Sequence, residues 1–145
     1  MDDIAAAASS IRSSSPMFLV RDMRATIDWY ESVGFKVEER YEQDGEVVFA
    51  RLSFGKAEFT LSPGGKTGPR DVRLWFFTEQ VDVLYRLFNE RPVRFEEELY
   101  EPYYGGRQFS IRDNNGMHLI FWQPKGLAAE TEPQDVASVP TPPRP

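Results

Sequence analysis

Few side chains in this sequence can carry out acid, base or covalent chemistry. The chain has one histidine, His118, it has no cysteine, and it contains no nucleophile motif. An imidazole can transfer protons, and a guanidinium such as that of Arg73 can stabilise an oxyanion. Because no carboxylate pair or nucleophile accompanies them, an enzyme that uses His118 and Arg73 is the weaker hypothesis. A hydrogen-bonded structural role is the favoured interpretation of His118.

Aromatic residues flank both positions. Alternate residues of a strand share a face, so Arg73 shares one with Trp75 and Phe77, and His118 shares one with Trp122. Aromatic side chains bury large areas and also line pockets for flat ligands. Two interpretations therefore stay open, a ligand-binding face or rings that belong to the core or a dimer interface.

The positions of these residues follow from the elements that the periodicity predicts. A capping Asp22 and apolar residues at helical spacing predict a helix that ends at Gly34, and a second helix is expected over 81–88. Apolar runs and alternating segments predict eight strands. They cover residues 17–20, 35–41, 46–54, 57–61, 72–78, 93–100, 107–112 and 117–122, and Asp113 to Gly116 is expected to be a turn.

The two halves of this order can be superimposed. Phe18 falls on Phe76 and Glu39 on Glu97, and the match drifts by two or three residues toward the end. Each half is β-α-β-β-β and exposes one face of its sheet, so neither half would be stable alone. We predict an α+β fold of two tandem βαβββ modules that form a curved mixed sheet with the helices outside.

The domain boundaries follow from composition. Residues 1–15 are small and polar and are expected to form a flexible arm or a short frayed helix. Residues 16–124 are expected to form one domain, with modules at about 16–62 and 71–124. The proline-rich segment 125–145 has no aromatic residue and is expected to be disordered.

Two segments carry a family resemblance. Residues 16–23 (PMFLVRDM), followed by Trp29-Tyr30 and Gly34-Phe35, resemble the opening strand and helix of the glyoxalase/bleomycin-resistance/extradiol-dioxygenase (vicinal oxygen chelate) superfamily. Residues 104–116 resemble its closing hairpin. The resemblance implies paired βαβββ modules around a cup, an assembly that is often dimeric, and a divalent metal held in the cup by His and Glu side chains.

The resemblance also implies where the metal ligands would lie. The first-strand positions are Ser15 and Arg73, and the last-strand positions are Thr60 and Ile120. None is a good metal ligand, and Arg73 would repel a cation. His118 with Glu58 would make a poor metal site. We therefore expect no metal and no cofactor, as in the bleomycin-resistance branch, which sequesters its ligand without chemistry.

If these positions face the cup, strand alternation predicts its lining. Tyr100, Tyr103 and Tyr104 lie beside Gly105-Gly106, where a mobile lid could close. Such a lining would stack a planar ligand and orient it by a few polar contacts. The predicted ligand-binding residues are Arg73, Trp75, Phe77, Tyr103, Tyr104, His118 and Trp122.

The charge of the ligand stays open. The acidic run Glu96-Glu97-Glu98 with Glu101 is either a solvated strand edge or an attraction for a cationic drug such as a bleomycin, whereas Arg73 favours an anionic or carbonyl-bearing ligand. The net charge of −6 argues against nucleic acid, and no apolar run is long enough to span a membrane. We expect a cytoplasmic homodimer that binds an aromatic or glycopeptide-like molecule. The alternatives are an atypical enzyme and a protein-interaction module.

Overall fold

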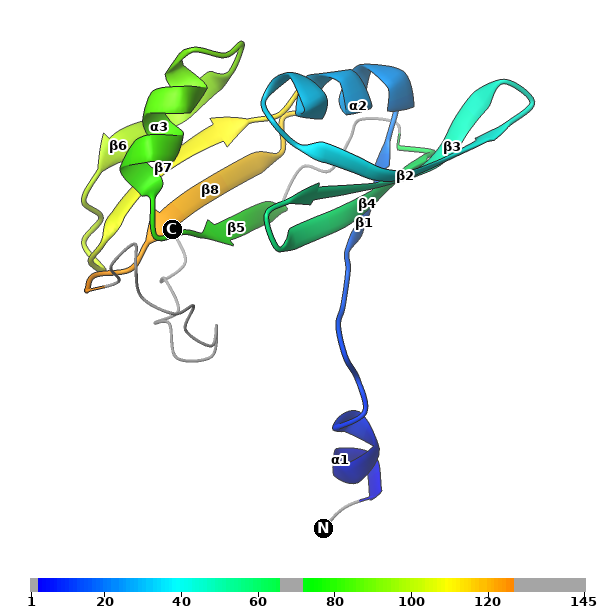
Figure 1. Ribbon diagram of the computed structural model, residues 1–145, viewed down its shortest axis with the longest axis horizontal. Coiled ribbons are helices and arrows are strands. Elements are labelled where there is room, and N and C mark those ends of the chain that lie inside the picture. The colour runs from blue at the N-terminus through cyan, green and yellow to red at the C-terminus, as the bar shows by residue number, and fades with distance from the viewer. Residues whose placement is uncertain (1–2, 66–71, 127–145) are drawn as a thin grey trace.

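Two copies of one strand-and-helix pattern make up the body of the protein (Figure 1). The computed structural model describes residues 3–65 and 72–126. The first module contains β1 (Met17–Val20), α2 (Met23–Ser32), β2 (Lys36–Gln43), β3 (Glu46–Phe54) and β4 (Ala57–Pro63). The second contains β5 (Arg73–Phe77), α3 (Val81–Asn89), β6 (Arg94–Tyr100), β7 (Arg107–Arg112) and β8 (His118–Gln123).

Each module forms its own four-stranded mixed sheet. The strand orders are β1-β4-β3-β2 and β5-β8-β7-β6, and the first strand of each module pairs in parallel with the last. The predicted α+β fold of two tandem βαβββ modules is therefore confirmed. Figure 1 shows α2 over the first sheet and α3 over the second.

Local signals set the ends of α2. The side chain of Asp22 accepts a hydrogen bond of 3.0 Å from the backbone N–H of Ala25, as an N-cap should. Gly34 follows the helix with φ of 110°, a backbone conformation that a side chain would strain. The helix that was expected between Asp22 and Gly34 is confirmed.

The helix-facing sides of the two sheets share one hydrophobic core. Phe54 of β3 contacts Phe88 of α3 and Phe121 of β8, with ring centroids 6.1 Å apart in both pairs. Phe76 of β5 contacts both Phe35 and Phe54 of the first module. The modules therefore pack against each other through one hydrophobic core.

A buried hydrogen bond joins the modules across this core. The hydroxyl of Tyr30, on α2, donates to the carboxylate of Asp113 at 2.6 Å, and Tyr30 is fully buried. Asp113 also accepts hydrogen bonds of 2.8 Å from the backbone N–H groups of Asn115 and Met117. Burial raises the pKa of Asp113, and the hydrogen bond from Tyr30 opposes that shift. The expected turn from Asp113 to Gly116 is thus also a contact between the modules.

The ends of the chain differ from the two modules. Residues 3–8 form a short helix, α1 (Asp3–Ala8), and Figure 1 shows it at the end of a segment that leads away from the sheets on the side opposite α2. The side chains of Ile4 and Ile11 are each 72% exposed. The segment 125–145, which we expected to be disordered, lies almost wholly outside the described residues.

Replacing Tyr30 with Phe tests the link between the modules. The substitution removes the donor of one oxygen of the buried Asp113 carboxylate, Oδ2, so the free energy of unfolding should fall by about 1–3 kcal/mol in urea denaturation followed by circular dichroism. Tyr41→Phe is the control, because Tyr41 is 58% exposed and its change should stay within about 0.5 kcal/mol. Equal stabilities of Tyr30→Phe and the unsubstituted protein would contradict this account.

Candidate ligand-binding site

The second sheet turns one face to α3 and the core, and we call the opposite face the inner face. Phe109, Ile111, Leu119 and Phe121 are fully buried on the core side. The residues that alternate with them therefore point to the inner face.

Strand register arranges the inner face in three rows. One row contains Arg73, His118, Arg112 and Arg94, the next contains Trp75, Ile120, Ser110 and Glu97, and the third contains Phe77, Trp122, Gln108 and Tyr100. Five of the seven residues that were predicted to bind a ligand lie in these rows. The other two, Tyr103 and Tyr104, come from the loop between β6 and β7.

Aromatic rings form one cluster on this face. Trp75 lies 6.1 Å from Trp122 and 6.5 Å from Tyr104, measured between ring centroids. Tyr104 lies 5.8 Å from Trp122, and Phe77 lies 5.9 Å from it. The edge-to-face geometry of these pairs is a favourable one for aromatic rings.

Trp122 is the buried floor of this cluster and does not line its surface as we expected. It is only 1% exposed, and its indole N–H donates to the carbonyl of Gly105 at 2.9 Å. A side chain at Gly106 would come within 2.6 Å of the Trp122 ring nitrogen, so a glycine is needed there. The accessible rings are those of Phe77, which is 41% exposed, and of the partly buried Trp75 and Tyr104.

The loop tyrosines have different surroundings. Tyr103 is 84% exposed, and its ring contacts Tyr104 edge to face. The hydroxyl of Tyr104 donates to Gln108 and so ties the loop to β7. Of these two loop residues of the predicted ligand-binding set, only Tyr104 is held against the inner face, and Tyr100, the third tyrosine of the predicted lid, is the last residue of β6.

Glu97 lies at the centre of a hydrogen-bond network on β6 and β7. Its carboxylate accepts from Tyr100 at 2.7 Å, from Ser110 at 2.9 Å and from Gln108 at 3.0 Å. Burial raises the pKa of Glu97, but these donors outweigh it and leave the pKa below its usual value. The carboxylate is therefore ionised at neutral pH.

The predicted ligand-binding set did not include Glu97, Tyr100, Gln108 or Ser110, although Glu97 belongs to the acidic run that was considered as an attraction for a cationic ligand. The alternation of Gln108 and Ser110 with the apolar residues of β7 was a usable signal. For Glu97 the signal was hidden, because the pairing of β6 with β7 shifts between Phe95 and Glu97. Such an irregularity changes which residues share a face.

His118 lies between two arginines in the strand register. Its Nε2 atom is buried and has no hydrogen-bond partner among the described residues. Burial, and then the charge of Arg112, lower the pKa of His118, with a smaller contribution from Arg73, while Glu97 and Glu96 act in the opposite direction. The imidazole is therefore neutral at pH 7, and the predicted hydrogen-bonded structural role lacks a partner for Nε2.

Arg112 and Arg73, the two arginines beside His118, differ in their contacts. The guanidinium of Arg112 donates to both carboxylate oxygens of Glu96, at 3.1 and 3.0 Å, and to the carbonyl of Gly116. Arg73 is exposed at the outer strand, β5. The residues of the acidic run also point to different sides of the sheet. Glu98 accepts a hydrogen bond from the hydroxyl of Tyr85 on α3, whereas Glu97 lies on the inner face.

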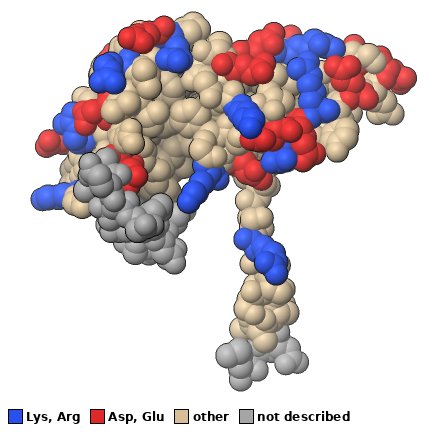
Figure 2. Space-filling model, in the orientation of Figure 1, with Lys and Arg blue, Asp and Glu red and all other residues tan. Residues whose placement is uncertain are grey.

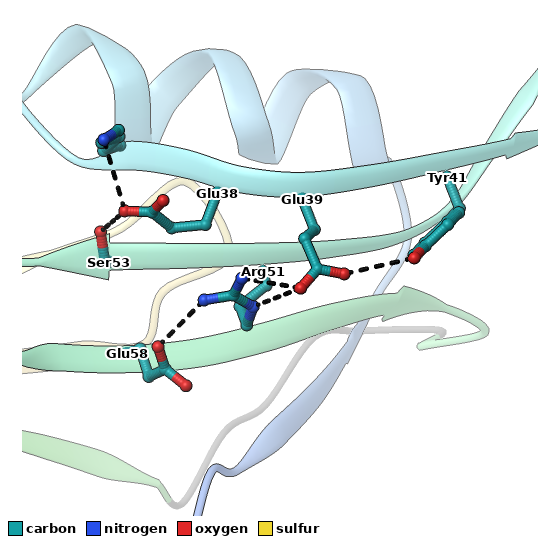
Figure 3. A network of polar contacts seen from close by, with 7 residues as sticks. Glu38, Glu39, Tyr41, Arg51, Ser53 and Glu58 are labelled. Carbon is teal, nitrogen blue, oxygen red and sulfur yellow. Dashed lines mark hydrogen bonds and ion pairs between the residues drawn. The ribbon is translucent and has the colours of Figure 1, made fainter.

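The corresponding face of the first sheet carries an ion-pair network (Figure 3). Arg51 on β3 donates to Glu39 at 3.0 and 2.7 Å and to Glu58 at 3.2 Å. The hydroxyl of Tyr41 also donates to Glu39. Here an arginine satisfies the carboxylate on the edge strand.

Two other surface features lie apart from the inner face. An open hollow of about 530 Å³ adjoins the first turn of α2, lined by residues that include Arg21, Arg24 and Glu46. Figure 2 shows acidic and basic side chains interspersed over the outer surface, without a continuous region of one sign. No helix among the described residues is long and apolar enough to cross a membrane.

The comparisons with known proteins agree with this architecture. A profile of the glyoxalase/bleomycin resistance protein/dioxygenase superfamily matches residues 12–121, and the chain therefore belongs to this superfamily. No curated protein sequence matches the chain.

Three solved structures show the same fold. TioX from Micromonospora sp. ML1 is 21% identical, with a TM-score of 0.64 over 83% of this chain and 100% of that one. The bleomycin resistance determinant encoded on transposon Tn5 is 16% identical, with a TM-score of 0.62 over 79% and 99%. A bleomycin-binding protein, solved in complex with bleomycin, is 16% identical, with a TM-score of 0.64 over 79% and 100%.

The residues at the superfamily's metal-ligand positions do not fit a metal ion. Ser15 is exposed, and the hydroxyl of Thr60 donates to the carbonyl of Pro16. Ile120 is buried and apolar, and Arg73 carries a positive charge. Within the described ranges no group of three or more His, Asp or Glu side chains could hold a metal ion.

The lowered pKa of His118 predicts how acid affects stability. The unfolded chain takes up this proton near pH 6.5, whereas the folded protein resists it, so the stability that His118 contributes is lost as the pH falls through 6.5. The melting temperature of the unsubstituted protein should therefore drop more between pH 8 and pH 5.5 than that of His118→Gln. If the melting temperatures of the two proteins fall equally between pH 8 and pH 5.5, the lowered pKa of His118 is refuted.

Proposed function

We propose that this protein is a non-catalytic small-molecule binding protein that holds an aromatic or glycopeptide-like ligand on the inner face of the second sheet. The observation that supports it most is the cluster of Trp75, Tyr104, Phe77 and Trp122 on a face that α3 does not cover. An accessible set of rings with a few polar groups beside it is typical of a site for a flat ligand.

The polar groups around these rings suit orientation better than turnover. The buried Nε2 atom of His118 has no hydrogen-bond partner among the described residues, and Arg73 lies opposite His118 on the next strand. The metal-ligand positions of the superfamily carry residues that do not bind metals well. Ligand sequestration of this kind would give resistance if the ligand were a toxic compound.

We further propose that a second copy of the chain covers the inner faces and completes the site. Met17 and Leu19 on β1 are 51% and 50% exposed, and Phe77 on β5 is 41% exposed. These apolar side chains lie on the outermost strands of the two sheets. Exposed apolar groups of this kind mark interaction surfaces.

The ligand proposal predicts a loss of affinity in Trp75→Ala. A thermal-shift screen against bleomycins, flavins and aromatic metabolites should find a compound that raises the melting temperature. Because an aromatic contact contributes about 0.5–1.5 kcal/mol beyond its buried area, Trp75→Ala should weaken that compound about fivefold or more in calorimetry. Trp29→Ala, on α2 of the other module, should bind it normally. Unchanged binding by Trp75→Ala would exclude this face as the site.

The dimer proposal predicts a change of mass in Leu19→Asp. Light scattering after gel filtration should give twice the chain mass of 16.7 kDa for the unsubstituted protein. A charge at this half-exposed position should shift the mass to that of one chain, because it would be buried without a partner in the interface. Leu87→Asp on α3 should stay dimeric. A single-chain mass for the unsubstituted protein would end the dimer proposal.

One observation favours an enzymatic alternative. The buried Nε2 of His118 is unpartnered and its neighbour across the strand pair is Arg73, the arrangement that an acid or base with an oxyanion donor needs. Turnover of a bound compound that His118→Gln abolishes, while the affinity stays unchanged, would favour this alternative over sequestration.

A further inference from the structure

The two modules place equivalent residues in equivalent rows, and one row differs in charge. In the first sheet the register runs Glu39, Arg51, Thr60 and Met17 from β2 to β1. In the second sheet the matching row is Glu97, Ser110, Ile120 and Trp75. Serine thus replaces the arginine, and tryptophan replaces the methionine.

The glutamates at the head of these rows each accept a hydrogen bond from a tyrosine of the same strand, but their other donors differ: Arg51 for Glu39, and Ser110 and Gln108 for Glu97. Tyr41 donates to Glu39, and Tyr100, in the matching position, donates to Glu97. Glu39 also has the guanidinium of Arg51, which approaches within 2.7 Å. No described basic side chain forms an ion pair with Glu97.

Neither of the two arginines beside His118 in the strand register forms an ion pair with Glu97. Arg73 lies on β5, three strands from β6, which is roughly 14 Å at the usual strand spacing. Arg112 is held by both oxygens of Glu96. The positive charge of Arg73 and the negative charge of Glu97 therefore lie at opposite edges of the inner face.

The carboxylate of Glu97 also has room for one more donor. An ionised carboxylate offers about four acceptor positions, and Tyr100, Gln108 and Ser110 occupy three. The network continues from Gln108 to Tyr104, whose ring contacts Trp75 and Trp122. A carboxylate that can accept a hydrogen bond from a cation therefore lies next to an aromatic surface.

We propose, on the basis of the ligand-binding function above, that Glu97 selects ligands with a protonated amine or guanidinium next to an aromatic ring. The ligand's cation takes the place that Arg51 occupies beside Glu39, and its ring lies against Trp75 and Tyr104. Such a cation gains both the carboxylate and the faces of these rings.

Three probes with one ring system test this proposal. Tryptamine carries a cation, tryptophol is its neutral analogue and indole-3-propionate is an anion. In titrations of the full chain followed by NMR, tryptamine should bind at least about tenfold more tightly than tryptophol, since charge-assisted hydrogen bonds are roughly twice as strong as neutral ones. Glu97→Gln should remove this preference by weakening the binding of tryptamine much more than that of tryptophol.

Two further variants make the test specific. Glu39→Gln changes the equivalent carboxylate, which Arg51 already engages, and should keep the preference for tryptamine. Ser110→Arg would rebuild the ion pair of the first module and should abolish the preference, provided that circular dichroism shows the fold intact. If Glu97→Gln does not fold, the preference measured for Ser110→Arg alone tests the role of Glu97.

The outcomes separate this proposal from the function on which it rests. Equal affinity for tryptamine and tryptophol, or a preference that survives in Glu97→Gln, would overturn the role of Glu97 and leave aromatic binding intact. If none of the three probes perturbs Trp75 or Tyr104 in the folded protein, both the charge selection and the proposed binding face are contradicted.

Discussion

The shared core between the modules is the constraint on which the rest of the structure depends. Phe35, Phe54 and Phe76 bring the helix-facing sides of both sheets into one apolar interior, and the bond from Tyr30 to Asp113 holds them in register. Because strand side chains alternate, burying one side of a sheet forces every second residue onto the other. The inner face, with Trp75 and its neighbours, is a direct consequence.

The two modules have the same framework of strands and helices, but the side chains on their inner faces are not equivalent. In the first module the carboxylate of Glu39 is neutralised within the chain by Arg51. In the second, Ser110 takes that position and Glu97 is satisfied only by neutral donors. In a duplicated fold, one face can therefore have its carboxylate paired within the chain, while the carboxylate of the other face can pair with another molecule.

Much of the fold followed from local signals. The cap at Asp22, the end of the helix at Gly34 and the turn from Asp113 to Gly116 were all predicted, since each depends on side-chain and backbone chemistry within a few residues. The strands were placed to within about two residues. The pairing of the halves was predicted because a single βαβββ unit cannot bury its own sheet.

The site could be predicted only in part. Alternation placed Arg73, Trp75, Phe77, His118 and Trp122 on one face, because period two is local to each strand. That Trp122 is buried depends on three rings from two other segments, β5 and the loop between β6 and β7, and no local signal contains this information.

The amino-acid sequence by itself determined the order of the elements, the duplication and the absence of good ligands at the superfamily's metal positions, since these depend on residue type and spacing. Only the tertiary structure decided which carboxylate of Glu96, Glu97 and Glu98 faces inward and which of them has a cationic partner. The physical reason is that the register shift in β6 and the pairing of distant strands set those distances, and charges interact through space and not along the chain.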